Sequence, residues 1–360
     1  MSQAAVNVLP HTALAAVNTG ARIKIYFQGE TGGLYELSTE DDRVYVCNEV
    51  VIPKRLDGAR VPRMFTPLAA CSYDEGNEVR LYYLDEDSII RELCWTMGHN
   101  GGMWYLGDLQ LGAQRIMAAH YSDLAVVYFG GKFRLYYQTP KDNSIVEVCK
   151  NKNDLWVKGS TLHATATPGT RLAATVSAGN EELVNIYYQD KTLHPCVVII
   201  TPKETTVDTR RTSEIHLPHR APLATLNHRM HTHDTLTSIN VYTQLQDNLI
   251  GKLSRSSEDT DLEFDILGEC GPLTSLAVVS GVTVDDDWVD GLRVFFLYQD
   301  GRMVSSGRES AVVVGKKAWS EVEEWMVEKR VTPVWPRGDW EGNLEWDGVD
   351  LDLGMKGEQE

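Results

Sequence analysis

Short apolar and aromatic runs alternate with polar turns along most of the chain. Runs of roughly four to eight such residues are typical of β-strands. One aromatic run returns six times, at intervals of 51 to 56 residues. Its central residues are Tyr26, Tyr82, Tyr136, Tyr187, Tyr242 and Phe295. An apolar residue followed by two alanines, as in Leu14-Ala15-Ala16 and Met117-Ala118-Ala119, precedes the run and weakens in the last two units. These two landmarks predict six copies of one structural unit.

Each unit holds four candidate strands. In the second unit, the aromatic strand is followed by a polar turn at 85–88, a third strand at 89–94 and a fourth segment at 104–107. Alanine pairs suit an inner strand, where neighbouring sheets crowd a central axis. Four strands per unit at this period are typical of a propeller blade. We therefore predict an all-β fold, a six-bladed β-propeller with four-stranded antiparallel blades, over residues 1–335.

Two segments near the C-terminus depart from the repeat. The stretch from Ala318 to Lys329 has a helical pattern and lies at the end of the sixth unit. Residues 336–360 are strongly acidic and contain Trp340 and Trp346. We expect them to form an acidic C-terminal tail, either solvated or added to the fold as an edge element.

Charge and hydropathy disfavour several classes of function. The formal net charge of -17 argues against nucleic acid as a partner, because Lys and Arg must replace its counterions. No apolar run approaches the roughly 20 residues of a membrane helix, so we expect no membrane insertion. The N-terminus lacks the basic start and apolar core of a secretory signal, which predicts a cytoplasmic protein or one released without a signal peptide. The six cysteines are spread out without a C-x-x-C pair, and we expect buried free thiols.

Three residue types recur at fixed places in the repeat. The second unit contains Val79-Arg80-Leu81-Tyr82-Tyr83, then Ile90-Arg91-Glu92-Leu93-Cys94-Trp95, then Trp104-Tyr105-Leu106-Gly107. The third unit repeats the pattern in Phe133-Arg134-Leu135-Tyr136-Tyr137, Ile145-Val146-Glu147 and Trp156-Val157-Lys158-Gly159. In these segments the chain resembles the fungal fucose-specific lectin family, over roughly residues 12–330. The resemblance implies a six-bladed propeller that binds fucose between adjacent blades, with Arg and Glu from one blade and the aromatic residue from the next.

The chemistry of a monosaccharide fits this set of side chains. Vicinal hydroxyls need donors and acceptors, and the C–H face of the sugar needs an aromatic cover. Arg supplies a rigid fork of donors and Glu supplies acceptors, both through charge-assisted hydrogen bonds. Arg80 and Glu92 are twelve residues apart, a spacing that suits a hairpin between adjacent strands. We expect them to pair and so to hold the pocket ready for a sugar.

Carried over onto this chain, the resemblance implies three unequal candidate sites for fucose. The site between units two and three fills all three roles, the site between units one and two has Lys for Arg, and the site between units three and four lacks a Trp. Lysine is a point charge that cannot reproduce the bidentate fork of Arg. The candidate ligand-binding residues, in that order of sites, are Arg80, Glu92 and Trp156; Lys24, Glu36 and Trp104; and Arg134 and Glu147.

The last three units have lost the pattern. Their residues in the Arg and Glu places are Asn185 and Val197, Asn240 and Lys252, and Arg293 and Ser305. We expect these units to bind no fucose in the manner of the family, which leaves one or two of six sites intact. Single-site affinity for a monosaccharide is usually weak, so useful binding of fucose-containing glycans or glycoproteins requires multivalency and favours a homodimer.

Other interpretations stay open at this point. Arg and Glu on neighbouring strands are commonly a simple ion pair, so the chain could be a degenerate propeller scaffold for protein–protein contacts that has lost sugar binding. An enzyme is not expected, because Asp-box repeats, a G-x-S-x-G elbow and an H-E-x-x-H motif are absent from the sequence. His228, His231 and His233 could ligate zinc if a loop brought them together, but we expect a solvent loop, no metal and no cofactor.

Overall fold

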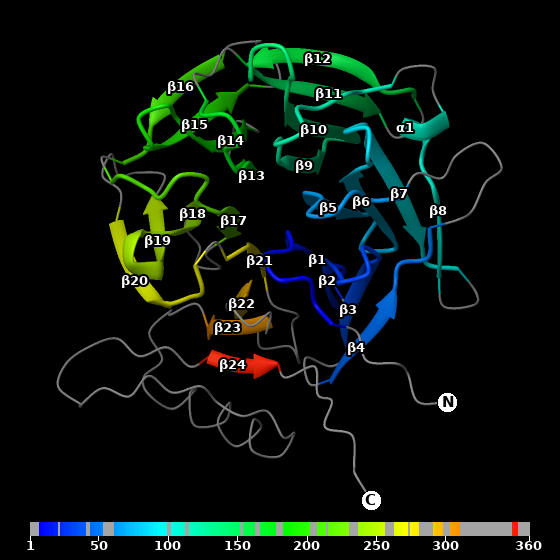
Figure 1. The fold of residues 1–360 in the computed structure, drawn as a ribbon, viewed down its shortest axis with the longest axis horizontal. Coiled ribbons are helices and arrows are strands. Elements are labelled where there is room, and N and C mark those ends of the chain that lie inside the picture. The colour runs from blue at the N-terminus through cyan, green and yellow to red at the C-terminus, as the bar shows by residue number, and fades with distance from the viewer. Residues whose placement is uncertain are drawn as a thin grey trace, which may run out of the picture.

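Each repeat folds into one four-stranded antiparallel sheet in the computed structural model of the chain, and the six sheets form a ring (Figure 1). Strand order follows chain order in every sheet. The predicted six-bladed β-propeller is therefore confirmed. The structure describes residues 7–20, 22–40, 44–52, 61–98, 102–111, 115–151, 154–162, 166–177, 183–201, 207–213, 215–229, 237–255, 263–272, 274–280, 291–297, 303–309 and 348–351.

The first three blades carry the strands that position the candidate sites. Blade 1 contains β1 (Ala15–Asn18), β2 (Ile23–Gln28), β3 (Leu34–Glu40) and β4 (Val44–Glu49). Blade 2 contains β5 (Leu68–Tyr73), β6 (Glu78–Leu84), β7 (Ile90–Thr96) and β8 (Met103–Leu106), followed by the short helix α1 (Asp108–Leu111). Blade 3 contains β9 (Leu124–Phe129), β10 (Lys132–Gln138), β11 (Ile145–Asn151) and β12 (Val157–Leu162).

The last three blades complete the ring with the same topology. Blade 4 contains β13 (Ala173–Ser177), β14 (Leu183–Gln189), β15 (Pro195–Ile200) and β16 (Val207–Arg211). Blade 5 contains β17 (Leu223–Arg229), β18 (Thr237–Gln244), the 3-10 turn η1 (Gln246–Asn248), β19 (Leu249–Arg255) and β20 (Glu263–Glu269). Blade 6 contains β21 (Leu276–Ser280), β22 (Gly291–Leu297), β23 (Met303–Glu309) and β24 (Gly348–Leu351).

The innermost strands line the centre of the ring (Figure 1). They contact one another in sequence, and β1 contacts both β5 and β21, so the ring closes between the first and last blades. The predicted alanine landmark is wrong in the third unit. Ala125, on β9, pairs with Tyr136 as Ala69 pairs with Tyr82. Met117-Ala118-Ala119 instead precedes β9, where Met117 forms an isolated bridge with Ile89.

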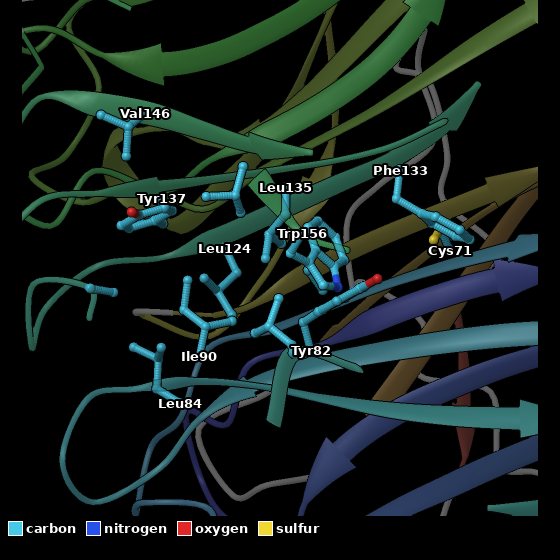
Figure 2. Close-up of a cluster of buried hydrophobic side chains, with 14 of the residues drawn as sticks. Cys71, Tyr82, Leu84, Ile90, Leu124, Phe133, Leu135, Tyr137, Val146 and Trp156 are labelled. Carbon is cyan, nitrogen blue, oxygen red and sulfur yellow. The ribbon is translucent and has the colours of Figure 1, made fainter. Parts of the chain in front are cut away.

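The hydrophobic core consists of separate clusters between adjacent blades rather than one central core. Ile25 and Phe27 of blade 1, for example, pack with Ala277 and Phe295 of blade 6. The cluster between blades 2 and 3 surrounds Trp156 (Figure 2). The aromatic landmark lies in these layers, and five of its six members are wholly inaccessible to solvent, namely Tyr26, Tyr82, Tyr136, Tyr242 and Phe295. A regular aromatic repeat therefore marks the packing of blade on blade.

A buried glutamine at the end of the aromatic strand ties one blade to the next. Gln138 Nε2 donates to the carbonyl of Asn143 in its own turn at 3.0 Å and to that of Thr167 in the next blade at 3.1 Å. Its Oε1 accepts the Gly169 amide at 2.9 Å. Comparable amides end the aromatic strands of blades 1, 4 and 5, at Gln28, Gln189 and Gln244. These side chains satisfy loop backbone groups that would otherwise be buried without partners.

Several expectations concern the ends and the general character of the chain. All six cysteines lie within the described residues without a disulfide bond, and five are buried. No helix within the described residues is long and apolar enough to cross a membrane. The helical pattern at 318–329 lies outside the described residues. From the acidic segment, β24 pairs with β23 as the outer strand of blade 6, while the domain boundary near residue 335 stays a prediction.

Candidate functional sites between adjacent blades

A cation, a glutamate and a tyrosine share one sheet face in each of the first three blades. Each tyrosine stands directly opposite its glutamate on the neighbouring strand, and each cation stands two residues before the tyrosine, hence on the same face. The tyrosine hydroxyl donates to the carboxylate in all three blades. The pairs are Tyr26 with Glu36 at 3.0 Å, Tyr82 with Glu92 at 3.0 Å, and Tyr136 with Glu147 at 3.4 Å.

The tyrosine was missed in the sequence analysis, although a signal was available. Tyr82 pairs with Glu92, and Arg80 pairs with Cys94, across β6 and β7. A hairpin register that places Arg and Glu diagonally therefore places the aromatic residue directly against the carboxylate. Burial first, and the neighbouring Glu92 second, raise the pKa of Tyr82 well above its ordinary range, so its hydroxyl stays a donor.

The aromatic wall comes from the next blade, as the resemblance implies. Trp104 of blade 2 packs perpendicular to the ring of Tyr26 of blade 1, with ring centroids 5.8 Å apart. Trp156 of blade 3 packs against Tyr82 of blade 2 in the same way, at 5.9 Å (Figure 2). The structure therefore brings together both predicted triplets that include a tryptophan.

The glycine three residues after each tryptophan serves a different site from the tryptophan itself. A β-carbon at Gly107 would collide with the carboxylate of Glu92, and one at Gly159 would lie 2.8 Å from Glu147 Oε1. Each glycine thus lets the outer strand approach the glutamate of its own blade. The tryptophan of the Trp-x-x-Gly motif packs on the tyrosine of the preceding blade, and its glycine makes room for the glutamate of its own blade.

Glu92 is wholly enclosed at the site between blades 2 and 3, since none of its surface is exposed. Its Oε1 accepts from Tyr82 and lies 3.9 Å from Arg80 Nε. Its Oε2 accepts from Trp156 Nε1 at 3.3 Å and from the backbone N–H of Leu109, in α1, at 3.2 Å. Donors from two blades and from the helix therefore converge on one carboxylate.

Arg80 lies in an aromatic enclosure beside this carboxylate. Its guanidinium carbon is 5.0 Å from the ring centroid of Tyr73, 5.8 Å from that of Tyr105 and 5.9 Å from that of Phe133. Its Nη1 donates to Glu78 at 3.0 Å, and its Nη2 donates a hydrogen bond to the Tyr73 hydroxyl. Glu78 and the two tyrosines were missed from the sequence, although Glu78 is two residues before Arg80 and so on the same face.

The site between blades 1 and 2 is built on a lysine. Lys24 Nζ lies 3.2 Å from Glu36 Oε1 and 3.3 Å from Oε2. It also lies 3.5 Å from the ring centroid of Trp95, which was not predicted as a site residue. Burial lowers the pKa of Lys24 against the opposing effect of Glu36. Glu36 retains 8% exposure, so its carboxylate is less enclosed than that of Glu92.

The site between blades 3 and 4 has the tightest ion pair and lacks a tryptophan. Arg134 Nη1 donates to both oxygens of Glu147, at 3.0 and 3.2 Å. Cys149 pairs with Val157 as Ile199 pairs with Asp208. Asp208 is therefore the equivalent of Val157. The residue before it, Val207, takes the position in blade 4 that Trp156 has in blade 3.

The remaining blades have replaced the polar set. Tyr187 stands opposite Val197 and Tyr242 opposite Lys252. Between blades 4 and 5, Tyr187 and Val197 pack in an apolar cluster that includes Leu223. Within the described residues, no group of three or more potential metal ligands gathers. The predicted loop with His231 and His233 lies outside those residues, and so does the side chain of His228.

Comparisons with known proteins agree with the repeat and the fold. The profile of a family described as fungal fucose-specific lectin matches residues 8–323. A fucose-specific lectin of Aspergillus oryzae is 33% identical over 175 residues, which are 48% of this chain and 51% of that protein. The fucose-specific lectin of Aleuria aurantia is 27% identical over 186 residues, which are 48% of this chain and 54% of that protein. The aligned part thus spans about half the length of these relatives.

Solved structures resemble the fold over most of its length. The crystal structure of AofleA from Arthrobotrys oligospora has a TM-score of 0.72 and 22% identity, covering 87% of this chain and 89% of that one. The six-bladed lectin of Aleuria aurantia has a TM-score of 0.65 and 20% identity, covering 86% of this chain and 96% of that one. At this level of identity, the likeness establishes the propeller fold.

Proposed function

The chain belongs to the fungal fucose-specific lectin family, and from this we propose that it binds fucose or fucosylated glycans in pockets between adjacent blades, without catalysis. The observation that carries the proposal is the polar set of one blade facing the aromatic wall of the next. It is present between blades 1 and 2, where Lys24 and Glu36 face Trp104, and between blades 2 and 3, where Arg80 and Glu92 face Trp156.

Each group has a distinct part in the proposed recognition. The cation donates to sugar hydroxyls, the carboxylate accepts from them, and the indole covers the C–H face of the sugar. The tyrosine under each carboxylate fixes its position before the sugar arrives, which lowers the entropic cost of binding. Between blades 3 and 4, Arg134 and Glu147 supply the polar half of the set alone, so we propose weaker binding there.

Protein–protein scaffolding is the second candidate function. Two observations favour it, the complete burial of Glu92 and the apolar packing between blades 4 and 5. A ring held together by such packing could persist after its sugar sites had been lost. The two candidates differ in one measurable property, the binding of a free monosaccharide.

Calorimetric titration of the full chain with L-fucose tests the proposal. We expect saturable heat that falls in Glu36→Gln relative to the unchanged chain. D-glucose serves as a control sugar, and Lys158→Met, at an exposed position of β12, serves as a control substitution. Absence of heat at millimolar fucose from a protein with a cooperative thermal transition would rule out the lectin function and favour the scaffold.

We also propose that the chain acts as a homodimer. Few complete sites per chain make each copy a weak binder of clustered glycans, and pairing two copies raises avidity without any new sugar contact. Light scattering coupled to size-exclusion chromatography measures the mass directly. A protein that has the mass of a monomer at all concentrations, and nevertheless agglutinates fucosylated beads, would contradict the proposed dimer.

A further inference from the structure

An ion pair joins blades 2 and 3 directly beside the buried glutamate. Lys150, on β11, places its Nζ 2.7 Å from Oδ2 of Asp108, the first residue of α1. The Lys150 side chain is only 5% exposed, whereas that of Asp108 is 50% exposed. A lysine buried to this degree requires a partner, because its unpaired charge would be costly away from water. The pair therefore links the two blades at a defined point.

The same lysine borders the aromatic wall of the site. Its Nζ lies 5.9 Å from the ring centroids of both Phe133 and Trp156. The helix that carries Asp108 also supplies the Leu109 amide to Glu92 Oε2, the oxygen that accepts Trp156 Nε1. The ion pair, the indole and the helix amide thus close one small region from both blades.

The neighbouring site shows what this region looks like with a different residue at the lysine position. Trp95 follows Cys94, which pairs with Arg80, and Lys150 follows Cys149 in the same way, opposite Arg134. Trp95 and Lys150 are therefore equivalent residues of blades 2 and 3. With tryptophan at this place, the glutamate of the preceding blade keeps some exposure, and with lysine it keeps none.

We propose that the Lys150–Asp108 ion pair holds the site between blades 2 and 3 closed, so that Glu92 becomes available to a sugar only when Trp156 leaves it. Lys150 and Asp108 are positioning residues that decide whether this site takes part in binding. The inference rests on the proposed function, because the occupant of the opened site is the same fucose.

The closed arrangement lowers affinity in two ways. A sugar must replace two donors at Glu92 Oε2, and each buried acceptor left without a donor is destabilising. The apparent affinity also falls in proportion to the fraction of molecules in which the site is open. Because Asp108 is half-exposed, salt weakens its attraction to Lys150, so we expect the site to open more often at high ionic strength.

Lys150→Met tests the inference, because methionine keeps an apolar chain against Phe133 and Trp156 but removes the charge. Asp108→Asn is the second variant; it alters a half-exposed residue and leaves no cavity. Lys158→Met, on the same blade, is the matched control. The first measurement is hydrogen exchange at the Leu109 amide in the absence of sugar. We expect exchange to quicken about tenfold or more in both Lys150→Met and Asp108→Asn and to stay unchanged in the control.

The second measurement is fucose titration of the same proteins. We expect Lys150→Met to bind additional fucose, seen as a higher stoichiometry or as a tighter binding phase. Adding Arg80→Ala to this variant should abolish the gain. Unchanged Leu109 exchange, or quicker exchange with no added Arg80-dependent binding, would overturn the proposed role of the Lys150–Asp108 ion pair. Fucose binding through Glu36 would then still support the lectin function. Absence of fucose binding in every variant, including those with quicker exchange, would reject both proposals.

Discussion

Trp156 Nε1, in blade 3, donates to Glu92 Oε2, in blade 2, at 3.3 Å across 64 residues of sequence. This bond places the indole nitrogen on the carboxylate, while the indole ring packs perpendicular to the ring of Tyr82. A tryptophan in this position both packs two blades together and occupies an acceptor that a sugar would need. Structure and recognition therefore depend on the same side chain.

Removing this donor separates its two roles. We expect Trp156→Phe to lower the free energy of unfolding by about 1.5–3 kcal/mol, since a hydrogen bond to a buried charged acceptor is lost while an aromatic ring remains. Trp104→Phe is the matched control, because within the described part of the chain its indole nitrogen has no bond to Glu36. Urea unfolding followed by circular dichroism measures both. Equal losses in the two variants would mean that ring size, rather than the bond to Glu92, accounts for the effect.

The two glycines of the Trp-x-x-Gly motif offer a test of close packing. We expect Gly107→Ala to destabilise the fold by about 1–3 kcal/mol, because its β-carbon would collide with the enclosed Glu92 carboxylate. Gly159→Ala, beside Glu147, should have a smaller effect of the same sign. Gly98→Ala is the control, since a β-carbon there meets no atom within 4 Å. Thermal unfolding measures all three variants. A loss of stability in Gly98→Ala as large as in the other two would contradict this role of the motif.

The fold and much of the polar set could be predicted from the sequence because both depend on local spacing. Arg80 and Glu92 are linked by one hairpin, and a hairpin fixes which residues share a face. The wrong landmark at Met117-Ala118-Ala119 shows the limit of this reasoning. Pairs of small residues also occur in loops, and only the register of β9 against β10 identifies Ala125 as the inner-strand alanine.

The features missed from the sequence depend on how blades dock on one another. Lys150 and Asp108 are 42 residues apart, and no repeat pattern marks them, because α1 follows only one blade among the described residues. The enclosure of Glu92 likewise depends on a backbone amide, which has no sequence signature. Residue spacing therefore predicts that Arg80, Glu92 and Trp156 meet, but it does not reveal whether a sugar can reach them.

The buried glutamines should matter to stability although they lie outside the candidate sites. We expect Gln138→Leu to lower the free energy of unfolding by about 2–3 kcal/mol, because the Asn143 and Thr167 carbonyls and the Gly169 amide lose their partner. Gln246→Leu, at an exposed position, is the control. Chemical denaturation measures both. A Gln138 variant as stable as its control would show that water replaces the lost amide.

Lys24 gives the site between blades 1 and 2 a pH dependence that Arg would not. Burial lowers the pKa of Lys24 from its ordinary value of 10.5; Glu36 opposes this shift and Arg22 adds to it. The ammonium donates to sugar hydroxyls only while it is charged. We therefore expect fucose binding at this site to weaken as the pH rises through the lowered pKa, before an exposed lysine would titrate.

Restoring the arginine should remove this dependence. We expect Lys24→Arg to bind fucose about tenfold more tightly, because its fork donates two charge-assisted bonds, and to keep that affinity at alkaline pH. Calorimetric titrations at several pH values, in the Arg80→Ala background to isolate this site, compare the two proteins, and Glu36→Gln provides the control without binding. The same loss of affinity with pH in the lysine and arginine forms would assign the effect to a group other than residue 24.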